Sequence, residues 1–149
     1  IGRPGPDGEA ASAARALSDA LIGEVRDADV LVIAAPLYNF GMPATLKAWF
    51  DLVLRAGETF TYGEAGPVGL IADKPVFVIG TSGGVYSEGD YAPFDFREPH
   101  VRTLLGFIGL KRVEFIRAEG LAFGEPDKVV EAACAKIDAE VAALLAPVA

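Results

Sequence analysis

Cysteine and histidine are nearly absent from this sequence, which holds one of each in 149 residues. The single Cys134 cannot form a disulfide within the chain, so we expect a reducing, cytoplasmic setting rather than secretion. One cysteine and His100 cannot build a structural zinc site without carboxylates, and we predict no metal.

Positive charge is scarce too, since 13 lysines and arginines stand against 21 acidic residues and give a formal net charge of −8. Such a deficit argues against a surface that follows the phosphates of a nucleic acid. Long apolar runs are also missing, because none approaches the roughly twenty residues that cross a membrane. No basic and then apolar leader opens the chain. We therefore predict neither a nucleic acid nor a membrane as a partner.

The sequence does hold enough apolar material for a core, at 52% hydrophobic residues. A chain of this length fits one domain, and we assign residues 1–149 to a single domain. Its organising stretch is an unbroken apolar run at 30–35, followed by a short loop and a helix from Pro43. An apolar run without alternation is typical of a strand that is buried on both faces of a sheet.

Helical and strand patterns alternate along the whole chain. They predict helices at 11–25, from 43, at 98–108 and at 126–145, and strands at 30–35, 75–80 and 113–116. This alternation indicates an α/β fold with an open parallel sheet, about three strands wide, and helices on both faces. Residues 57–73 remain as a long connection whose aromatic residues favour an ordered loop that covers a site. Residues 86–96 are predicted to be irregular.

Two loops that follow strands form the candidate binding site. They consist of Pro36, Leu37, Tyr38, Asn39 and Phe40, and of Thr81, Ser82, Gly83 and Gly84. Glycines let backbone amides approach a flat ligand, Asn39 offers a polar group, and the aromatic rings offer apolar walls. Together they would suit a planar heterocycle with a polar edge. Alternatively, the glycine pair is only a turn and the aromatic rings close the core, and the residues alone leave both interpretations open.

No catalytic nucleophile accompanies these loops. His100 has no motif around it, and Cys134 lies among alanines in a helix, where burial is expected. Ser82 lacks the strand-to-helix elbow of a serine hydrolase. Any redox chemistry would therefore have to come from a bound cofactor.

Five segments of the chain, taken in order, carry a family resemblance. They read PLYNFGMPATLKAWFDLVLRAG, TFTYGEAGPVGL, TSGG, LGFIGL and AEGLAFG. They resemble the FMN-dependent NADH-azoreductases, which are related to the NAD(P)H quinone oxidoreductases. The resemblance implies a flavodoxin-like fold and an enzyme that binds FMN. Its chemistry would be ping-pong hydride transfer from NADH or NADPH, through the flavin, to a quinone or azo acceptor.

Carried over residue by residue, the resemblance also implies roles within the site. Residues 36–40 would hold the isoalloxazine ring of FMN, and residues 81–84 would contact its pyrimidine side. Tyr62 and Phe107 match positions that line the pocket in which nicotinamide and then the acceptor stack. In the family this pocket commonly lies across a homodimer interface, so the resemblance implies a homodimer.

The chain departs from the family at its start. It has neither the first strand nor the serine-rich loop that binds the FMN phosphate, so we expect an N-terminally truncated member whose strand at 30–35 has an open edge. Ser82 stands where the family commonly has arginine, and Tyr86 stands where histidine is frequent. An alternative from another class is a cofactor-free, flavodoxin-like fragment that acts only as a dimerisation or interaction module.

Overall fold

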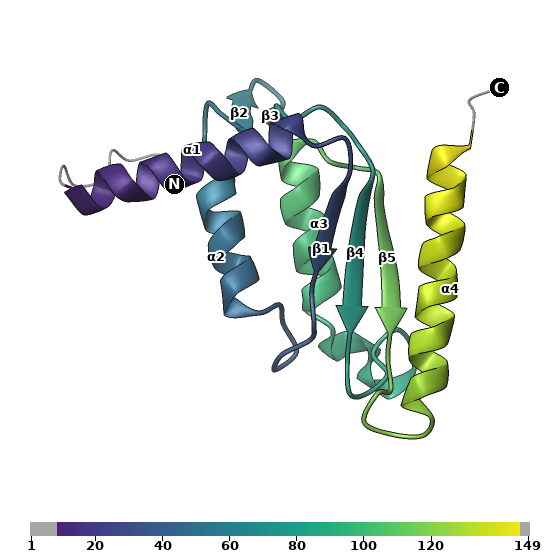
Figure 1. The fold of residues 1–149 in the computed structure, drawn as a ribbon. Coiled ribbons are helices and arrows are strands. Elements are labelled where there is room, and N and C mark those ends of the chain that lie inside the picture. Colours follow the sequence, from purple (N-terminus) through teal and green to yellow (C-terminus); the bar gives the residue numbers. More distant parts are fainter. Residues whose placement is uncertain (1–8, 147–149) are drawn as a thin grey trace.

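Figure 1 shows the fold as a computed structural model, which describes residues 9–146. Parallel strands form the main sheet in the order β1-β4-β5, namely β1 (Leu31–Ala34), β4 (Val76–Thr81) and β5 (Val113–Ala118). The α-helices in this part of the chain are α1 (Glu9–Asp27), α2 (Ala44–Val53), α3 (Arg97–Ile108) and α4 (Pro126–Leu145). The predicted α/β fold with an open parallel sheet is confirmed, and each predicted helix and strand is present at its expected place.

Helices cover the two faces of this sheet unequally. α2 and α3 lie on one face and α4 lies on the other (Figure 1). Because strand side chains alternate between faces, Val76 and Val78 are fully buried on the α2 and α3 side, whereas Phe77 faces a groove beside α4. The main core lies on the α2 and α3 side, and its largest members are Phe50, Phe115, Ile22, Leu105, Ile108 and Leu110.

The prediction that the strand at 30–35 is buried on both faces is wrong. Ile33 is buried, but Val32 is 69% exposed and Ala34 is exposed as well. The cause is the position of β1 at one edge of the sheet, while α4 packs chiefly against β5 at the other edge. Among the described residues no strand pairs with the outer edge of β1, and this edge adjoins a groove of about 270 Å³ whose other wall is α2.

Residues 57–73, expected as a loop, contain an antiparallel hairpin instead. Its strands are β2 (Phe60–Gly63) and β3 (Gly66–Gly69). Two four-residue strands bounded by glycines give too short an alternation to be recognised in the sequence. The hairpin packs on the end of α3, where the Ile71 amide donates to the Ile108 carbonyl at 3.0 Å.

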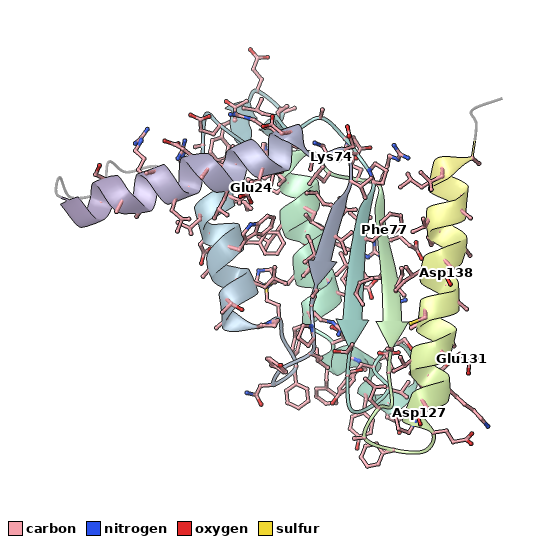
Figure 2. The ribbon with its side chains drawn as sticks, in the orientation of Figure 1. Glu24, Lys74, Phe77, Asp127, Glu131 and Asp138 are labelled. Carbon is pink, nitrogen blue, oxygen red and sulfur yellow. The ribbon has the colours of Figure 1, made fainter. Side chains whose placement is uncertain are left out.

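A buried lysine fastens the end of α1 to the start of β4. The Lys74 ammonium group donates to the carbonyls of Val25 at 2.8 Å and Arg26 at 3.0 Å, and also to that of Ala28. A helix leaves its last carbonyls unpaired and carries partial negative charge at that end. A lysine ammonium group there donates hydrogen bonds to the carbonyls and offsets the negative charge. Figure 2 labels Lys74 beside the part of α1 that carries Glu24.

Replacing Lys74 by methionine should lower the free energy of unfolding by about 2 kcal/mol, because several carbonyls lose a charged donor. Methionine keeps an apolar stem of similar length, so the packing changes little. Chemical denaturation followed by circular dichroism measures the loss. Lys128→Met is the control, since that side chain is exposed and forms an exposed ion pair with Glu125. An equal loss in both variants would contradict this role of Lys74.

Candidate functional site

The two candidate loops meet at the carboxyl edge of the sheet. β1 and β4 are parallel neighbours, so the segments that follow them leave the sheet side by side. The Leu37 amide donates to the Thr81 carbonyl at 2.8 Å, and this bond joins the first loop to the second. The structure therefore brings residues 36–40 and 81–84 together in one place.

The first loop contains a strained two-residue turn. Tyr38 and Gly41 exchange backbone hydrogen bonds of 2.9 and 3.0 Å, and between them Asn39 has φ 48° and Phe40 has φ 69°. Positive φ at both central residues is typical of a type I′ turn, and it costs a non-glycine residue roughly 1–2 kcal/mol. Strain of this kind clusters at ligand sites. The turn leaves Tyr38 63% exposed and Phe40 46% exposed, so these rings do not close the core.

The second loop is held by the segment that follows β5. The carbonyls of Ser82, Gly83 and Gly84 accept hydrogen bonds of 3.0–3.1 Å from the amides of residues 120–122. Ser82 is buried, and its hydroxyl donates to the Gly84 carbonyl at 2.8 Å, so its side chain stabilises the turn. The amides of Gly83 and Gly84 donate to no other residue in the described part of the chain. Two free adjacent amides can bind an anionic or carbonyl-bearing edge of a ligand.

Aromatic rings that the sequence analysis did not select adjoin the first loop. Phe40 lies 5.9 Å from Phe94 and 6.3 Å from Tyr86, measured between ring centroids. Phe94 ends a short 3₁₀ helix, η1 (Gly89–Phe94), in the segment that was expected to be irregular. The Tyr86 amide donates to Glu119 Oε1 at 3.1 Å, which gives Glu119 a structural role. The density of aromatic residues in this segment is the sequence signal that could have identified them.

Arg97, the first residue of α3, is the residue that sequence reasoning missed most clearly. Its side chain is completely buried, and its Nη1 donates to the carbonyls of Ala35 and Thr81 at 3.1 Å each. Asp95 pairs with its Nη2 at 3.1 Å. An arginine at a helix start is usually solvent-exposed, and no local pattern in the sequence indicated that this one is buried beneath the two loops.

Tyr62 and Phe107 lie near each other but far from the two loops. Phe60 packs against both, with ring centroids 5.7 Å from Tyr62 and 4.7 Å from Phe107. These rings belong to the hairpin and to the last turn of α3, whereas Arg97 in the first turn contacts the loops. The rise of α3 from Arg97 to Phe107 is about 15 Å, at 1.5 Å per residue. The structure does not bring Tyr62 and Phe107 to the two loops of the same chain.

A groove of about 510 Å³ runs between α2 and α3 and ends beside the hairpin. Its apolar lining comes from both helices and the hairpin, namely Leu54, Phe60, Leu104 and Phe107. At the end of α2 the hydrogen bond from Arg55 to Asp19 raises the pKa of the Arg55 guanidinium, so a fixed positive charge stands there. An apolar groove beside exposed rings suits a flat ligand or another protein surface.

Within residues 9–146, no three or more His, Cys, Asp or Glu side chains gather in a way that could hold a metal ion. None of the described helices has the length and apolar character needed to cross a membrane. Cys134 is exposed on α4, so the expectation that it is buried is wrong.

Comparison with known proteins identifies relatives of this chain. The family described as flavodoxin-like fold matches residues 5–141. An FMN-dependent NADH:quinone oxidoreductase of Hyphomonas neptunium is 58% identical over 112 residues, which cover 75% of this chain and 54% of that protein. One from Cellvibrio japonicus is 47% identical over 126 residues, which cover 85% of this chain and 62% of that protein. The chain thus spans a little more than half the length of these curated relatives.

Solved structures agree with the sequence relatives. An FMN-dependent NADH-azoreductase of Bacillus anthracis in complex with FMN aligns with a TM-score of 0.87 at 26% identity, over 95% of this chain and 68% of that one. Another azoreductase of that organism gives a TM-score of 0.76 at 36% identity, over 89% and 64% of the two chains. The resemblance expected from the five segments is confirmed. The chain belongs to the flavodoxin-like fold family, and its relatives there include FMN-dependent NADH:quinone oxidoreductases and azoreductases.

Proposed function

We propose that this chain carries the ring-binding part of an FMN-dependent NADH:quinone or azo oxidoreductase. The observation that carries the proposal is the joined pair of loops at 36–40 and 81–84, with free amides at Gly83 and Gly84. The carboxyl ends of neighbouring parallel strands are where open α/β sheets bind ligands. The relatives are named for FMN, NADH, quinones and azo reduction, which supports the same ligands here. A reducing cytoplasm, favoured by the single cysteine, is the location we propose.

The residues of both loops fit a flat ring with a polar edge. Residues 36–40 would hold the isoalloxazine ring, with the exposed rings of Tyr38 and Phe40 as apolar walls and the Asn39 amide as a hydrogen-bonding group. Residues 81–84 would contact the pyrimidine side through the free glycine amides. Bound FMN supplies the hydride-transfer chemistry. The amides would stabilise the negative charge that develops on the ring during reduction.

A second copy of the chain would complete the site. Phe107 lies about 15 Å along α3 from Arg97, the residue that contacts the loops of its own chain, and Tyr62 packs with Phe107 around Phe60. Both rings are therefore too far from these loops to line a pocket there. Tyr62 is 65% exposed, and Val68 in the hairpin and Leu70 just after it also expose apolar side chains. We therefore propose a homodimer in which two-fold symmetry sets the hairpin of one copy beside the loops of the other. The nicotinamide of NADH or NADPH, and then the acceptor, would stack against these rings.

Replacing Asn39 by glycine should weaken FMN binding about tenfold, because one hydrogen-bonding side chain is lost. Glycine adopts positive φ freely, so the turn with φ 48° at this position is kept. Titration of the protein with FMN, followed by quenching of flavin fluorescence, measures both dissociation constants. Asp138→Ala, at an exposed position of α4 outside both loops and the hairpin, is the control and should leave the constant unchanged. A wild-type chain that leaves FMN fluorescence unquenched at high micromolar concentration would overturn the proposed function.

The open edge of β1 favours a second candidate function from a different class. A strand at a sheet edge presents unpaired N–H and C=O groups, and Val32 exposes an apolar side chain beside them. A cofactor-free module would pair with another sheet through this edge. Both functions allow a dimer, so the size of the particle does not separate them. The FMN titration does, because a chain that dimerises and ignores FMN fits only the interaction module.

A further inference from the structure

One buried side chain is bonded to the start of both loops. Arg97 Nη1 donates at 3.1 Å to the Ala35 carbonyl and at 3.1 Å to the Thr81 carbonyl. Ala35 directly precedes the first loop, and Thr81 opens the second. A single nitrogen atom therefore helps to fix where both loops leave the sheet.

The surroundings of this guanidinium are close-packed. A methyl group on Gly80 of β4 would lie 3.1 Å from Nη1 and 3.2 Å from Cζ, so only glycine leaves the guanidinium its full room. Asp95 holds the other end, where Oδ2 pairs with Nη2 at 3.1 Å and Oδ1 accepts from the Arg97 amide at 2.8 Å. A buried ion pair gives little net stability over apolar packing. The Arg97–Asp95 pair is therefore better explained by the groups that it positions than by stability.

We propose that Arg97 is a positioning residue of the flavin-ring site, setting the spacing between the loops at 36–40 and 81–84 through their first carbonyls. This inference rests on the proposed function, since the spacing matters for a ligand that spans both loops. The planar guanidinium suits the task because its donors point in fixed directions and can hold several acceptors at once.

Two variants of Arg97 separate its reach from its charge. Arg97→Gln loses both, whereas Arg97→Lys keeps the charge but ends one atom short of the position of Nη1. We expect hydrogen exchange in the FMN-free protein to become at least about tenfold faster in Arg97→Gln at the hydrogen-bonded amides of both loops, and to change less in Arg97→Lys. These amides are those of Leu37 and Tyr38 in the first loop and of Ser82 in the second. The FMN dissociation constant should rise in the same order, by about tenfold in Arg97→Gln.

Arg102→Gln is the matched control on the same helix. Arg102 also bonds a carboxylate and a backbone carbonyl, those of Glu98 and Val113, but its side chain is exposed and contacts neither loop. This variant should leave exchange in both loops and the FMN dissociation constant unchanged. If it accelerates the loops as Arg97→Gln does, the positioning role is overturned.

Three results with the Arg97 variants would also overturn the inference. They are unchanged loop exchange in a folded variant, acceleration in only one loop, and equal acceleration in every element of the fold. Arg97→Lys carries the comparison if Arg97→Gln does not fold. A wild-type chain that ignores FMN would defeat the proposed function alone, because the exchange of the FMN-free loops still decides whether Arg97 positions them.

Discussion

Replacing Gly69 by alanine should lower the free energy of unfolding by about 3 kcal/mol, at the upper end of what overpacking usually costs. A methyl group on Gly69 would lie 2.2 Å from the Gly109 nitrogen and 2.3 Å from the Ile108 carbonyl carbon. Both atoms belong to the backbone at the end of α3, which cannot rotate away as a side chain does. The hairpin would have to move off α3 and break the hydrogen bond from the Ile71 amide to the Ile108 carbonyl.

Gly63→Ala is the matched control in the same hairpin. Its methyl group would lie 3.5 Å from Cγ2 of Val68, an ordinary van der Waals contact, so we expect a change below about 1 kcal/mol. Urea denaturation followed by circular dichroism compares the two variants. Equal midpoints for Gly69→Ala and Gly63→Ala would contradict the close approach of the hairpin to α3.

This contact gives a physical reason for two of the five segments on which the family resemblance was based. Gly69 belongs to TFTYGEAGPVGL and Gly109 belongs to LGFIGL, and the two residues lack side chains where their backbones meet. In the same way, AEGLAFG supplies the amides of residues 120–122 that hold the turn at 81–84. Segments that stand far apart in the sequence therefore contact one another in the fold. A single sequence does not reveal which segments are in contact.

Features of the fold that depend on local pattern were predictable, whereas features that depend on distant neighbours were not. Helix α4 occupies the predicted residues 126–145, because apolar periodicity and a proline at the helix start are local signals. The exposure of Val32 depends on what lies over its strand, which an apolar run cannot disclose. The burial of Arg97 depends on carbonyls from β1 and β4, which lie far from it in the sequence.

The same distinction between local pattern and distant neighbours applies to the candidate site. Its two loops were predictable as a pair because they follow strands that become neighbours in a parallel sheet. The place of Tyr62 and Phe107 was not, because it depends on the direction and length of α3 and on a hairpin that the sequence did not indicate. The proposed site takes residues from two copies of the chain. Two copies with different defects can therefore form one intact site together, and this gives the strongest functional test.

Two defective variants should restore activity when they are co-expressed, if the homodimer shares its sites as proposed. Gly83→Asp puts a carboxylate beside the amides that would face the flavin ring, while a double variant, Tyr62→Ala with Phe107→Ala, removes the rings on the hairpin side. Each alone should lose NADH-dependent quinone reduction by about a hundredfold, the scale of losing stabilising groups at a reacting centre. In a mixed dimer, both defects fall in one site and the other site is intact.

Random pairing makes about half of the dimers mixed, each with one intact site of two, so about a quarter of the wild-type rate should return. A site built within one chain predicts no recovery, because every chain then carries a defect in its own site. The control pairs Gly83→Asp with Asn39→Gly, whose defects lie in the same half. No mixed dimer of that pair has an intact site, so its rate should stay at the average of the two variants. Recovery in the control as large as in the test pair would show that mixing itself restores activity. That result would contradict the proposed shared site.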